Sequence, residues 1–157
     1  MILCILGSGG HTSELLTLIQ DIESQFIFIC SKDDNLSAIK AMKRYPNAKI
    51  YTIMRPRLPA QPIVYAIPRI LASFFSSLFV AFQIFLNYNI KVVIGNGPGI
   101  CVLLFLIFRI LGMNTVYVES FARVNSLSLT GKLVKHYCRN FIVQWKRNGE
   151  LAMEWIV

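Results

Sequence analysis

Charge is scarce in this sequence, and acidic charge is the scarcest. Only 15% of the 157 residues are charged, and eight Asp and Glu stand against sixteen Lys and Arg, which leaves a net charge of +8. Apolar residues make up 55% of the chain, and this excludes a disordered protein, because disordered chains are charge-rich and apolar-poor. The basic excess favours an anionic partner: nucleic acid, a phosphorylated substrate or an anionic membrane surface.

Paired cysteines and a basic leader are also missing. The four cysteines lie at least 26 residues apart, with no C-x-x-C pair, at Cys4, Cys30, Cys101 and Cys138. This spacing predicts free thiols in a reducing compartment, with no disulfide framework and no metal site. Residues 1–6 lack the basic region of a signal peptide and run directly into glycines, so they are expected to form a strand.

The longest uncharged run falls just short of a membrane span. Ile70 to Leu86 is seventeen residues without a charge, whereas a spanning helix needs about 20 apolar residues. At helical spacing, the polar residues in and beside this run fall on one narrow arc: Arg69, Ser73, Ser76, Ser77, Gln83 and Asn87. This predicts a helix that is buried or lies on a membrane. Four prolines between residues 55 and 68 predict an extended loop before it.

Apolar strand-like runs alternate with helix-like segments along the rest of the chain. The expected strands are 2–6, 26–30, 49–53, 91–94, 115–118 and 140–143. Such alternation predicts an α/β fold, a Rossmann-like and mostly parallel sheet with helices on both faces. Ligands of these sheets bind beyond the carboxyl ends of the strands, where the sequence has three candidate segments, Gly7–Thr12, Gly95–Gly99 and Glu119–Arg123.

These segments carry the candidate chemistry. A glycine-rich turn before a helix offers free N–H groups to an anion, and His11 in that turn is either a general base or a helix-cap residue. Glu119 is either a second acid–base group or the ion-pair partner of Arg123, and Ser120 is a candidate helix cap. The G-x-G-x-x-G fingerprint fails at Thr12, but the acids at 33 and 34 keep a dinucleotide-binding oxidoreductase domain as an alternative.

Four motifs occur in an order that resembles a known family. They are Leu6–Thr12, Gly95–Gly99, Val118-Glu119-Ser120 with Arg123-Val124, and Phe141–Trp145. They resemble the membrane-side subunit of the two-chain UDP-N-acetylglucosamine transferase that acts on dolichyl-diphosphate-GlcNAc, a family similar to the N-terminal half of GT-B glycosyltransferases. A bacterial-type exopolysaccharide glycosyltransferase subunit is a close alternative, and a non-catalytic membrane scaffold is a third reading.

The resemblance implies an activity and a site. It implies inverting β1,4 transfer of a second GlcNAc in N-glycan precursor synthesis, with a separate donor-binding chain and no activity of this chain alone. It implies a lipid-diphosphate-linked sugar as acceptor, no cofactor and no nucleic acid. His11 and Glu119 are the expected catalytic pair. The expected substrate-binding residues are Gly7, Ser8, Gly9, Gly10, Thr12, Asn96, Gly97, Ser120 and Arg123.

The resemblance also implies a place in the cell. The expected location is the cytosolic face of the endoplasmic reticulum membrane. Many relatives in the family begin with a membrane anchor, whereas Met1 here leads directly into the first expected strand, so the chain is expected to bind peripherally, without an N-terminal anchor. The expected membrane contacts are Arg55, Arg57, Arg69, Phe74 and Phe75. Residues 1–147 are expected to form the lobe, and residues 148–157 a tail that docks the partner through Trp155, Ile156 and Val157.

Overall fold

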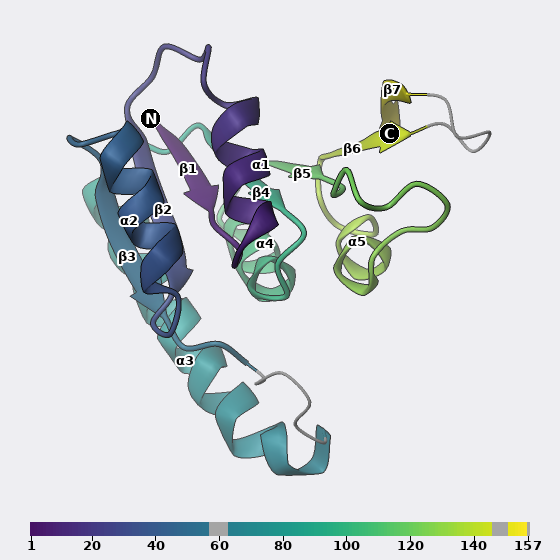
Figure 1. Cartoon of the computed structure of the whole chain (residues 1–157). Helices are drawn as coiled ribbons and strands as arrows, with labels where there is room; N and C mark the ends of the chain where they lie inside the picture. Colours follow the sequence, from purple (N-terminus) through teal and green to yellow (C-terminus); the bar gives the residue numbers. More distant parts are fainter. Residues whose placement is uncertain (57–62, 146–150, 157) are drawn as a thin grey trace.

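Strands and helices alternate along the chain around one sheet (Figure 1). The computed structural model describes residues 1–56, 63–145 and 151–156, except for the side chains of 63, 64, 66 and 151–156. The strands are β1 (Ile2–Ile5), β2 (Phe26–Ser31), β3 (Lys49–Ile53), β4 (Val92–Asn96), β5 (Asn114–Val118), β6 (Asn140–Trp145) and β7 (Leu151–Ile156). The helices are α1 (Gly10–Leu18), α2 (Asn35–Arg44), α3 (Ile63–Asn87), α4 (Ile100–Ile110) and α5 (Leu129–Val134).

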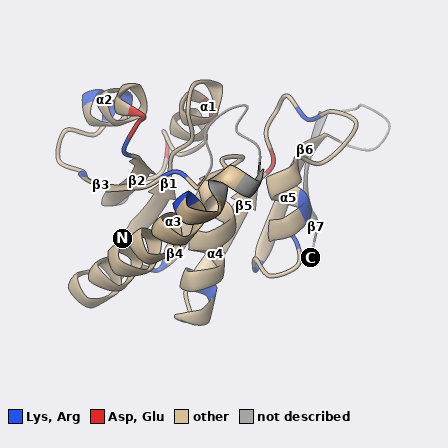
Figure 2. Ribbon diagram, turned by 90° about the horizontal axis from the view of Figure 1, so that it is seen from below, with Lys and Arg blue, Asp and Glu red and all other residues tan. Residues whose placement is uncertain are grey.

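The sheet order is β3-β2-β1-β4-β5-β6-β7, and every neighbouring pair is parallel except β6 and β7. Helices α1 and α2 cover one face, and α3, α4 and α5 cover the other (Figure 2). Each face has its own apolar core, one around Phe28 under α1 and α2, the other around Phe105 and Tyr117. The predicted Rossmann-like α/β fold is therefore confirmed. The strand order reverses between β1 and β4, because β2 and β3 extend the sheet on one side and β4 to β6 extend it on the other. Such sheets bind ligands at this switch point.

Helix α3 begins earlier than the prolines predict. Pro68 was expected to lie in an extended loop, but it lies inside α3, which starts at Ile63. Proline in the sixth helical position removes the backbone hydrogen bond to residue 64, and its ring crowds the carbonyl of that residue. This disturbance lies near the start of a 25-residue helix, and most of the helix and its packing lie beyond it. The expectation of a loop up to residue 68 was wrong for this reason.

The first half of the polar arc of α3 faces the protein, and the end of the arc does not. Ser73 and Ser77 are buried, and the Ser73 hydroxyl donates to the carbonyl of Met54 at 2.7 Å. The last two members of the arc, Gln83 and Asn87, are exposed. Opposite this arc, α3 presents exposed apolar side chains along its whole described length: Tyr65, Ile67, Ile70, Leu71, Phe74, Phe75, Leu78, Phe79, Phe82, Phe85 and Leu86.

One local prediction near the site differs from the structure. The helix after β5 starts at Leu129, and its cap is Ser128, whose Oγ accepts from the N–H of Gly131. Ser120 is therefore not a helix cap, because the loop from 119 to 128 separates it from α5. Helix α1 ends at Leu18, and the chain turns through residues 19–22.

Candidate functional site

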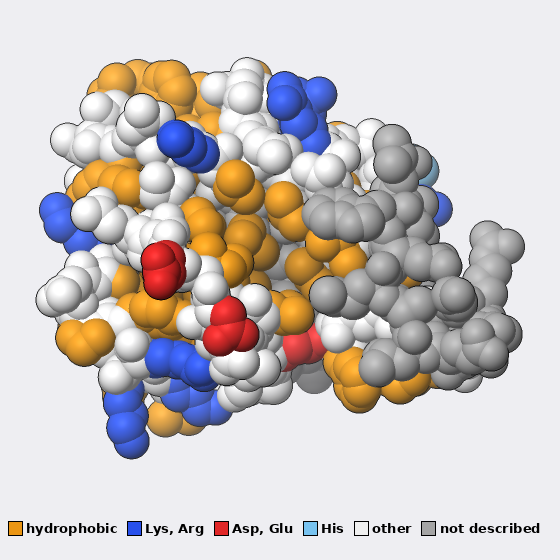
Figure 3. All heavy atoms as spheres, turned by 90° about the horizontal axis from the view of Figure 1, so that it is seen from above, with side chains coloured by type: hydrophobic (Ala, Val, Ile, Leu, Met, Phe, Trp, Pro, Cys, Tyr) orange, Lys and Arg blue, Asp and Glu red, His pale blue; other side chains and the backbone are white. Residues whose placement is uncertain are grey.

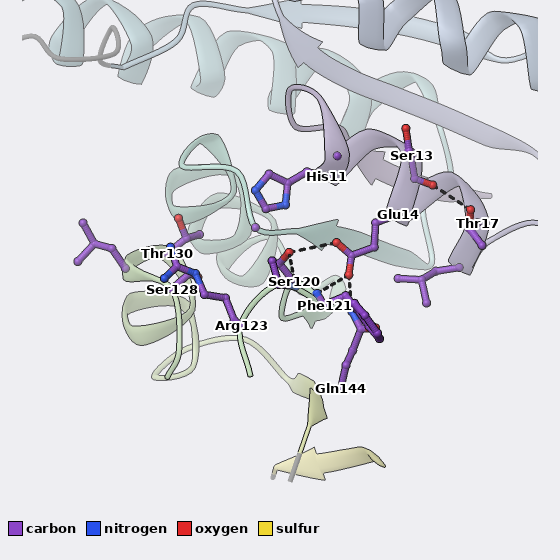
Figure 4. A pocket seen from close by; sticks show the side chains of 15 residues that line it. His11, Ser13, Glu14, Thr17, Ser120, Phe121, Arg123, Ser128, Thr130 and Gln144 are labelled. Carbon is purple, nitrogen blue, oxygen red and sulfur yellow. Dashed lines mark hydrogen bonds between the residues drawn. The ribbon is translucent and has the colours of Figure 1, made fainter. Parts of the chain in front are cut away.

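The three predicted segments meet at the carboxyl edge of the sheet. Ile5 pairs with Gly95, and Asn96 pairs with Val118, so the turns that follow β1, β4 and β5 are neighbours. Beside them lies a cavity of about 970 Å³. Its walls come from α1, the β4–α4 turn, the β5–α5 loop and β6 (Figure 4), and its polar lining side chains are His11, Ser13, Glu14, Thr17, Ser120, Arg123, Ser128, Thr130 and Gln144.

His11 is the group that the two glycine-rich turns enclose. Its Nδ1 lies 2.9 Å from Oδ1 of Asn96, whose side chain is fully buried. Gly97 has a φ of +75°, and a Cβ at this position would overlap the imidazole ring. A Cβ on Gly7 would lie 2.9 Å from Cβ of His11 and 2.8 Å from Cβ of Pro98. Both turns therefore need glycine so that the histidine fits between them.

Thr12 holds the first turn closed. Its hydroxyl is hydrogen-bonded to the carbonyl of Gly7 and to Oγ of Ser37. Asp34 caps α2, and its two carboxylate oxygens accept from the N–H and the hydroxyl of Ser37. Asp34 is buried and its carboxylate caps α2, so this acid has a structural role, which weakens the support for dinucleotide binding at Asp34.

Glu119 is almost completely buried, and its partners lie in the loop that follows it. The side chain is 1% exposed. Oε1 accepts from the N–H of Ser120, and Oε2 accepts from the N–H and the hydroxyl of Ser128 at 2.9 and 3.1 Å. A Cβ on Gly131 would overlap this carboxylate. The expected ion pair with Arg123 is not formed, because the Glu119 oxygens serve the two ends of the β5–α5 loop.

Glu14 is the site residue that sequence reasoning missed. It lies one helical turn after His11 and lines the same cavity (Figure 4). Oε1 accepts from the N–H of Phe121 at 2.6 Å and from Nε2 of Gln144 at 2.5 Å, and Oε2 accepts from the hydroxyl of Ser120 at 3.1 Å. The i, i+3 spacing from His11 was the signal that could have identified it.

A second cavity of about 310 Å³ shares His11 and Gly97 with the first and opens on the side of the Arg55 side chain. Nε of Arg55 lies 3.5 Å from a carboxylate oxygen of Asp33, and Nε of Arg69 donates to the Arg55 carbonyl at 3.1 Å. Two of the predicted membrane-contacting cations therefore lie together at the start of α3. Arg57 lies outside the described residues.

Most of the remaining predicted substrate-binding residues line one of the two cavities, and the other predicted residues lie elsewhere. Gly10, Gly97, Ser120 and Arg123 line the larger cavity, and Gly7 and Ser8 line the smaller one. Gly9 lines neither; it precedes α1 with a φ of +65° and leaves that helix without a side-chain cap. Phe74 and Phe75 are exposed on α3, far from the cavity. Trp155 and Ile156 belong to β7, but their side chains, and Val157 entirely, lie outside the described residues.

The cysteines are free thiols, as predicted, and Cys4, Cys30 and Cys101 are buried. Burial raises the pKa of the Cys4 and Cys101 thiols, and burial together with the charge of Asp34 raises that of Cys30 to about 11. Within residues 1–56, 63–145 and 151–156, no three His, Cys, Asp or Glu side chains come together in a way that could hold a metal ion.

Comparison with known proteins identifies the family. The model of the family described as "Oligosaccharide biosynthesis protein Alg14 like" matches residues 2–153. A Candida albicans protein named UDP-N-acetylglucosamine transferase subunit ALG14 is 38% identical over 156 residues, which cover 90% of this chain and 69% of that protein. The human protein of the same name is 32% identical over 163 residues, which cover 92% of this chain and 74% of that protein.

A solved structure supports the fold. Acinetobacter baumannii MurG, a GT-B glycosyltransferase, superposes with a TM-score of 0.70 at 18% identity, over 99% of this chain and 44% of MurG. The chain thus spans less than half of MurG, about one lobe of a GT-B enzyme. The family match and the identity to these relatives over most of their length together show that this chain belongs to the Alg14 family of oligosaccharide biosynthesis proteins.

Proposed function

We propose that this chain is the acceptor-binding half of a two-chain UDP-N-acetylglucosamine transferase, which adds the second, β1,4-linked GlcNAc to GlcNAc-diphosphate-dolichol. The relatives named above carry the name of a transferase subunit, and the fold corresponds to 44% of the single-chain enzyme MurG. In this proposal a separate chain supplies the lobe that binds UDP-GlcNAc. The observation on which the proposal depends is His11, held against Asn96 at the mouth of a cavity large enough for a sugar.

The chemistry proposed at this edge is an inverting displacement. The acceptor hydroxyl attacks the anomeric carbon of the GlcNAc donor, the bond to UDP breaks, and the hydroxyl proton passes to the imidazole of His11. A histidine suits this step, because its unperturbed pKa lies close to neutral pH. The uncapped first turn of α1 provides free N–H groups for the acceptor diphosphate.

The two carboxylates have different tasks in this proposal. Glu14 lies beside His11 in the cavity wall and offers a negative charge that stabilises the imidazolium formed during transfer. Glu119 supports the site indirectly, because its oxygens fix both ends of the β5–α5 loop, which carries Ser120 and Arg123. In this reading Arg123 contacts the anionic part of the substrates.

The proposed membrane contact is the outer face of α3. The segment Ile67–Asn87 of this helix is long and apolar enough to cross a membrane, and 28% of an 18-residue apolar stretch within it is buried. One side of the helix packs on the protein through Ser73, Ser77 and Ile84. A helix fastened along one side fits a peripheral position with its apolar face in the bilayer interface. Arg55 and Arg69 at its start would meet lipid phosphates on the cytosolic face of the endoplasmic reticulum. On the face seen in Figure 3, by contrast, Lys and Arg lie in several separate places.

The proposed contact with the donor-binding chain includes the C-terminal tail. Residues Leu151–Ile156 form β7, the antiparallel strand at the edge of the sheet. An edge strand presents unpaired backbone groups to a second chain. Deletion of residues 155–157 should therefore weaken co-purification of the two chains, and undiminished co-purification would contradict this part of the proposal.

Reconstitution tests the division into two chains. The purified chain alone should transfer no GlcNAc from UDP-GlcNAc to a short-chain lipid-diphosphate-GlcNAc, whereas the chain co-expressed with a donor-binding subunit should produce the disaccharide with β1,4 linkage. Transfer by this chain alone would refute the division. Transfer to a free sugar at the same rate as to the lipid diphosphate would refute the proposed acceptor.

A further inference from the structure

Asn96 is in contact with His11 but is hidden from any substrate. Its side chain is fully buried, its Oδ1 lies 2.9 Å from Nδ1 of His11, and its Nδ2 is a buried polar atom without a hydrogen-bond partner among the described residues. A buried N–H group without a hydrogen-bond partner destabilises the fold. The contact with His11 is the one hydrogen bond that the Asn96 side chain makes among the described residues, so we attribute the position of this amide to that contact.

We propose that Asn96 is a positioning residue that selects the tautomer of His11. Oδ1 of Asn96 is an acceptor only, so the imidazole nitrogen facing it, Nδ1, carries the proton. Nε2 then keeps its lone pair and becomes the nitrogen that takes the proton of the acceptor hydroxyl. The inference rests on the proposed role of His11 as the general base and adds the group that makes this role available.

The surroundings of the ring support a fixed geometry. Gly97 leaves no room beside the imidazole, since a Cβ there would overlap it, and Gly7 packs against Cβ of His11. The ring is therefore held in place from two turns, and Nε2 has no hydrogen-bond partner among the described residues. A histidine whose ring is clamped and whose Nδ1 is bound can use only Nε2 for a proton transfer.

Charged groups around His11 have to be considered in any pH experiment. Glu14 on α1 and Arg123 in the β5–α5 loop share the larger cavity with His11, and Asp34 and Arg55 share the smaller one. The β4–α4 turn contributes Gly97 and Pro98, which do not titrate. A change at Asn96 leaves all four charges in place, so a shift in the pH profile of such a variant reports on the contact between Asn96 and His11.

The first test reads the tautomer directly. The chain has two histidines, so a complex with the donor-binding chain, carrying His136→Gln and ¹⁵N-histidine in this chain only, gives the signals of His11 alone. Above the pH at which the imidazole is neutral, the ¹⁵N spectrum should show a protonated Nδ1 and an unprotonated Nε2. A protonated Nε2 overturns the inference, whatever the activity of the complex, because it would mean that the Asn96 amide faces the ring with its N–H group.

The second test separates positioning from packing. Asn96→Ala should lower kcat by about 100-fold, the lower end of what a general base contributes, with little change in KM. Asn96→Asp keeps an acceptor oxygen, so it should restore part of kcat and move the acidic limb of the kcat/KM profile to higher pH, since a carboxylate raises the pKa of a neighbouring imidazole. Equal losses in both variants at unchanged Tm, with an unmoved pH profile, would overturn the inference. If Asn96→Ala does not fold, the spectrum of the His136→Gln complex still decides.

Discussion

Oε1 of Glu14 accepts a hydrogen bond of 2.6 Å from the backbone N–H of Phe121, 107 residues further along the chain. The same oxygen accepts from Nε2 of Gln144 on β6. One carboxylate on the first helix thus joins the β5–α5 loop and the last parallel strand into one wall of the cavity, as Figure 4 shows. The same turn of α1 therefore carries both the carboxylate that holds this wall together and His11, the proposed base.

Glu14→Gln is expected to loosen this wall. Hydrogen bonds to charged groups contribute roughly 1.5–3 kcal/mol, so the variant should lower the free energy of unfolding by about 1–3 kcal/mol and raise KM for the acceptor. Chemical denaturation and transfer kinetics measure the two effects. Glu23→Gln on the exposed turn after α1 is the control and should change neither; equal stability of both variants would contradict the role of Glu14.

Gly97→Ala is expected to abolish transfer by displacing His11. Gly97 and Gly112 both have positive φ, +75° and +83°, but only a Cβ on Gly97 meets the imidazole, whereas a Cβ on Gly112 has nothing within 4 Å. Each alanine costs about 1–2 kcal/mol of backbone strain, so both variants should lower Tm. Only Gly97→Ala should lose activity. If Gly112→Ala loses as much transfer, the loss comes from strain, and the contact with His11 is not its cause.

The outer face of α3 is expected to bind lipid. Phe75 and Phe79 are 66% and 72% exposed on this helix, and burying a phenylalanine contributes about 1.5–3 kcal/mol. Phe75→Glu and Phe79→Glu should each reduce flotation with anionic vesicles at least about tenfold without lowering Tm. Leu36→Glu is the matched control, because Leu36 is 73% exposed on α2, on the opposite face of the sheet. Flotation that is equally reduced in all three variants would point to a general charge effect.

The buried thiols make stability depend on pH in the alkaline range. Burial raises the pKa of Cys30 from 9.0 to about 11, with a further contribution from Asp34. Between these values the unfolded chain loses the thiol proton and the folded chain retains it, so the free energy of unfolding falls as the pH rises from 9 to 11. Denaturation at pH 8, 9 and 10 should show this fall, and Cys30→Ala should make it shallower. A slope that is unchanged in Cys30→Ala would show that other groups cause it.

The fold could be predicted from the sequence because its strands are short apolar runs that alternate with helix-like segments. The position of His11, Asn96 and Glu119 at one edge followed from the rule that parallel strands present their carboxyl ends together. The start of α3 could not be predicted in the same way. Pro68 argues for a loop on local grounds, but α3 runs through it and is held on the protein further along, where Ser73 and Ser77 are buried.

The roles of the acids were harder to predict than their positions. Glu119 follows β5 at a position where an acid–base group is expected, and its oxygens accept hydrogen bonds from Ser120 and Ser128. Hydrogen-bond partners that lie nine residues away in an irregular loop leave no periodic signal in a sequence. Glu14 has partners more than 100 residues away, so its part in the cavity became visible only in three dimensions.

The most direct test of the central claim compares the two histidines of the chain in the reconstituted two-chain enzyme. His136 lies on the surface after α5, away from the residues that line the cavity. Initial rates of GlcNAc transfer to lipid-diphosphate-GlcNAc should fall by at least about 100-fold in His11→Gln, in line with the loss of a general base. The same rates should stay unchanged in His136→Gln, with both complexes assembled and of normal Tm. Transfer by the assembled His11→Gln complex at the wild-type rate would contradict the account.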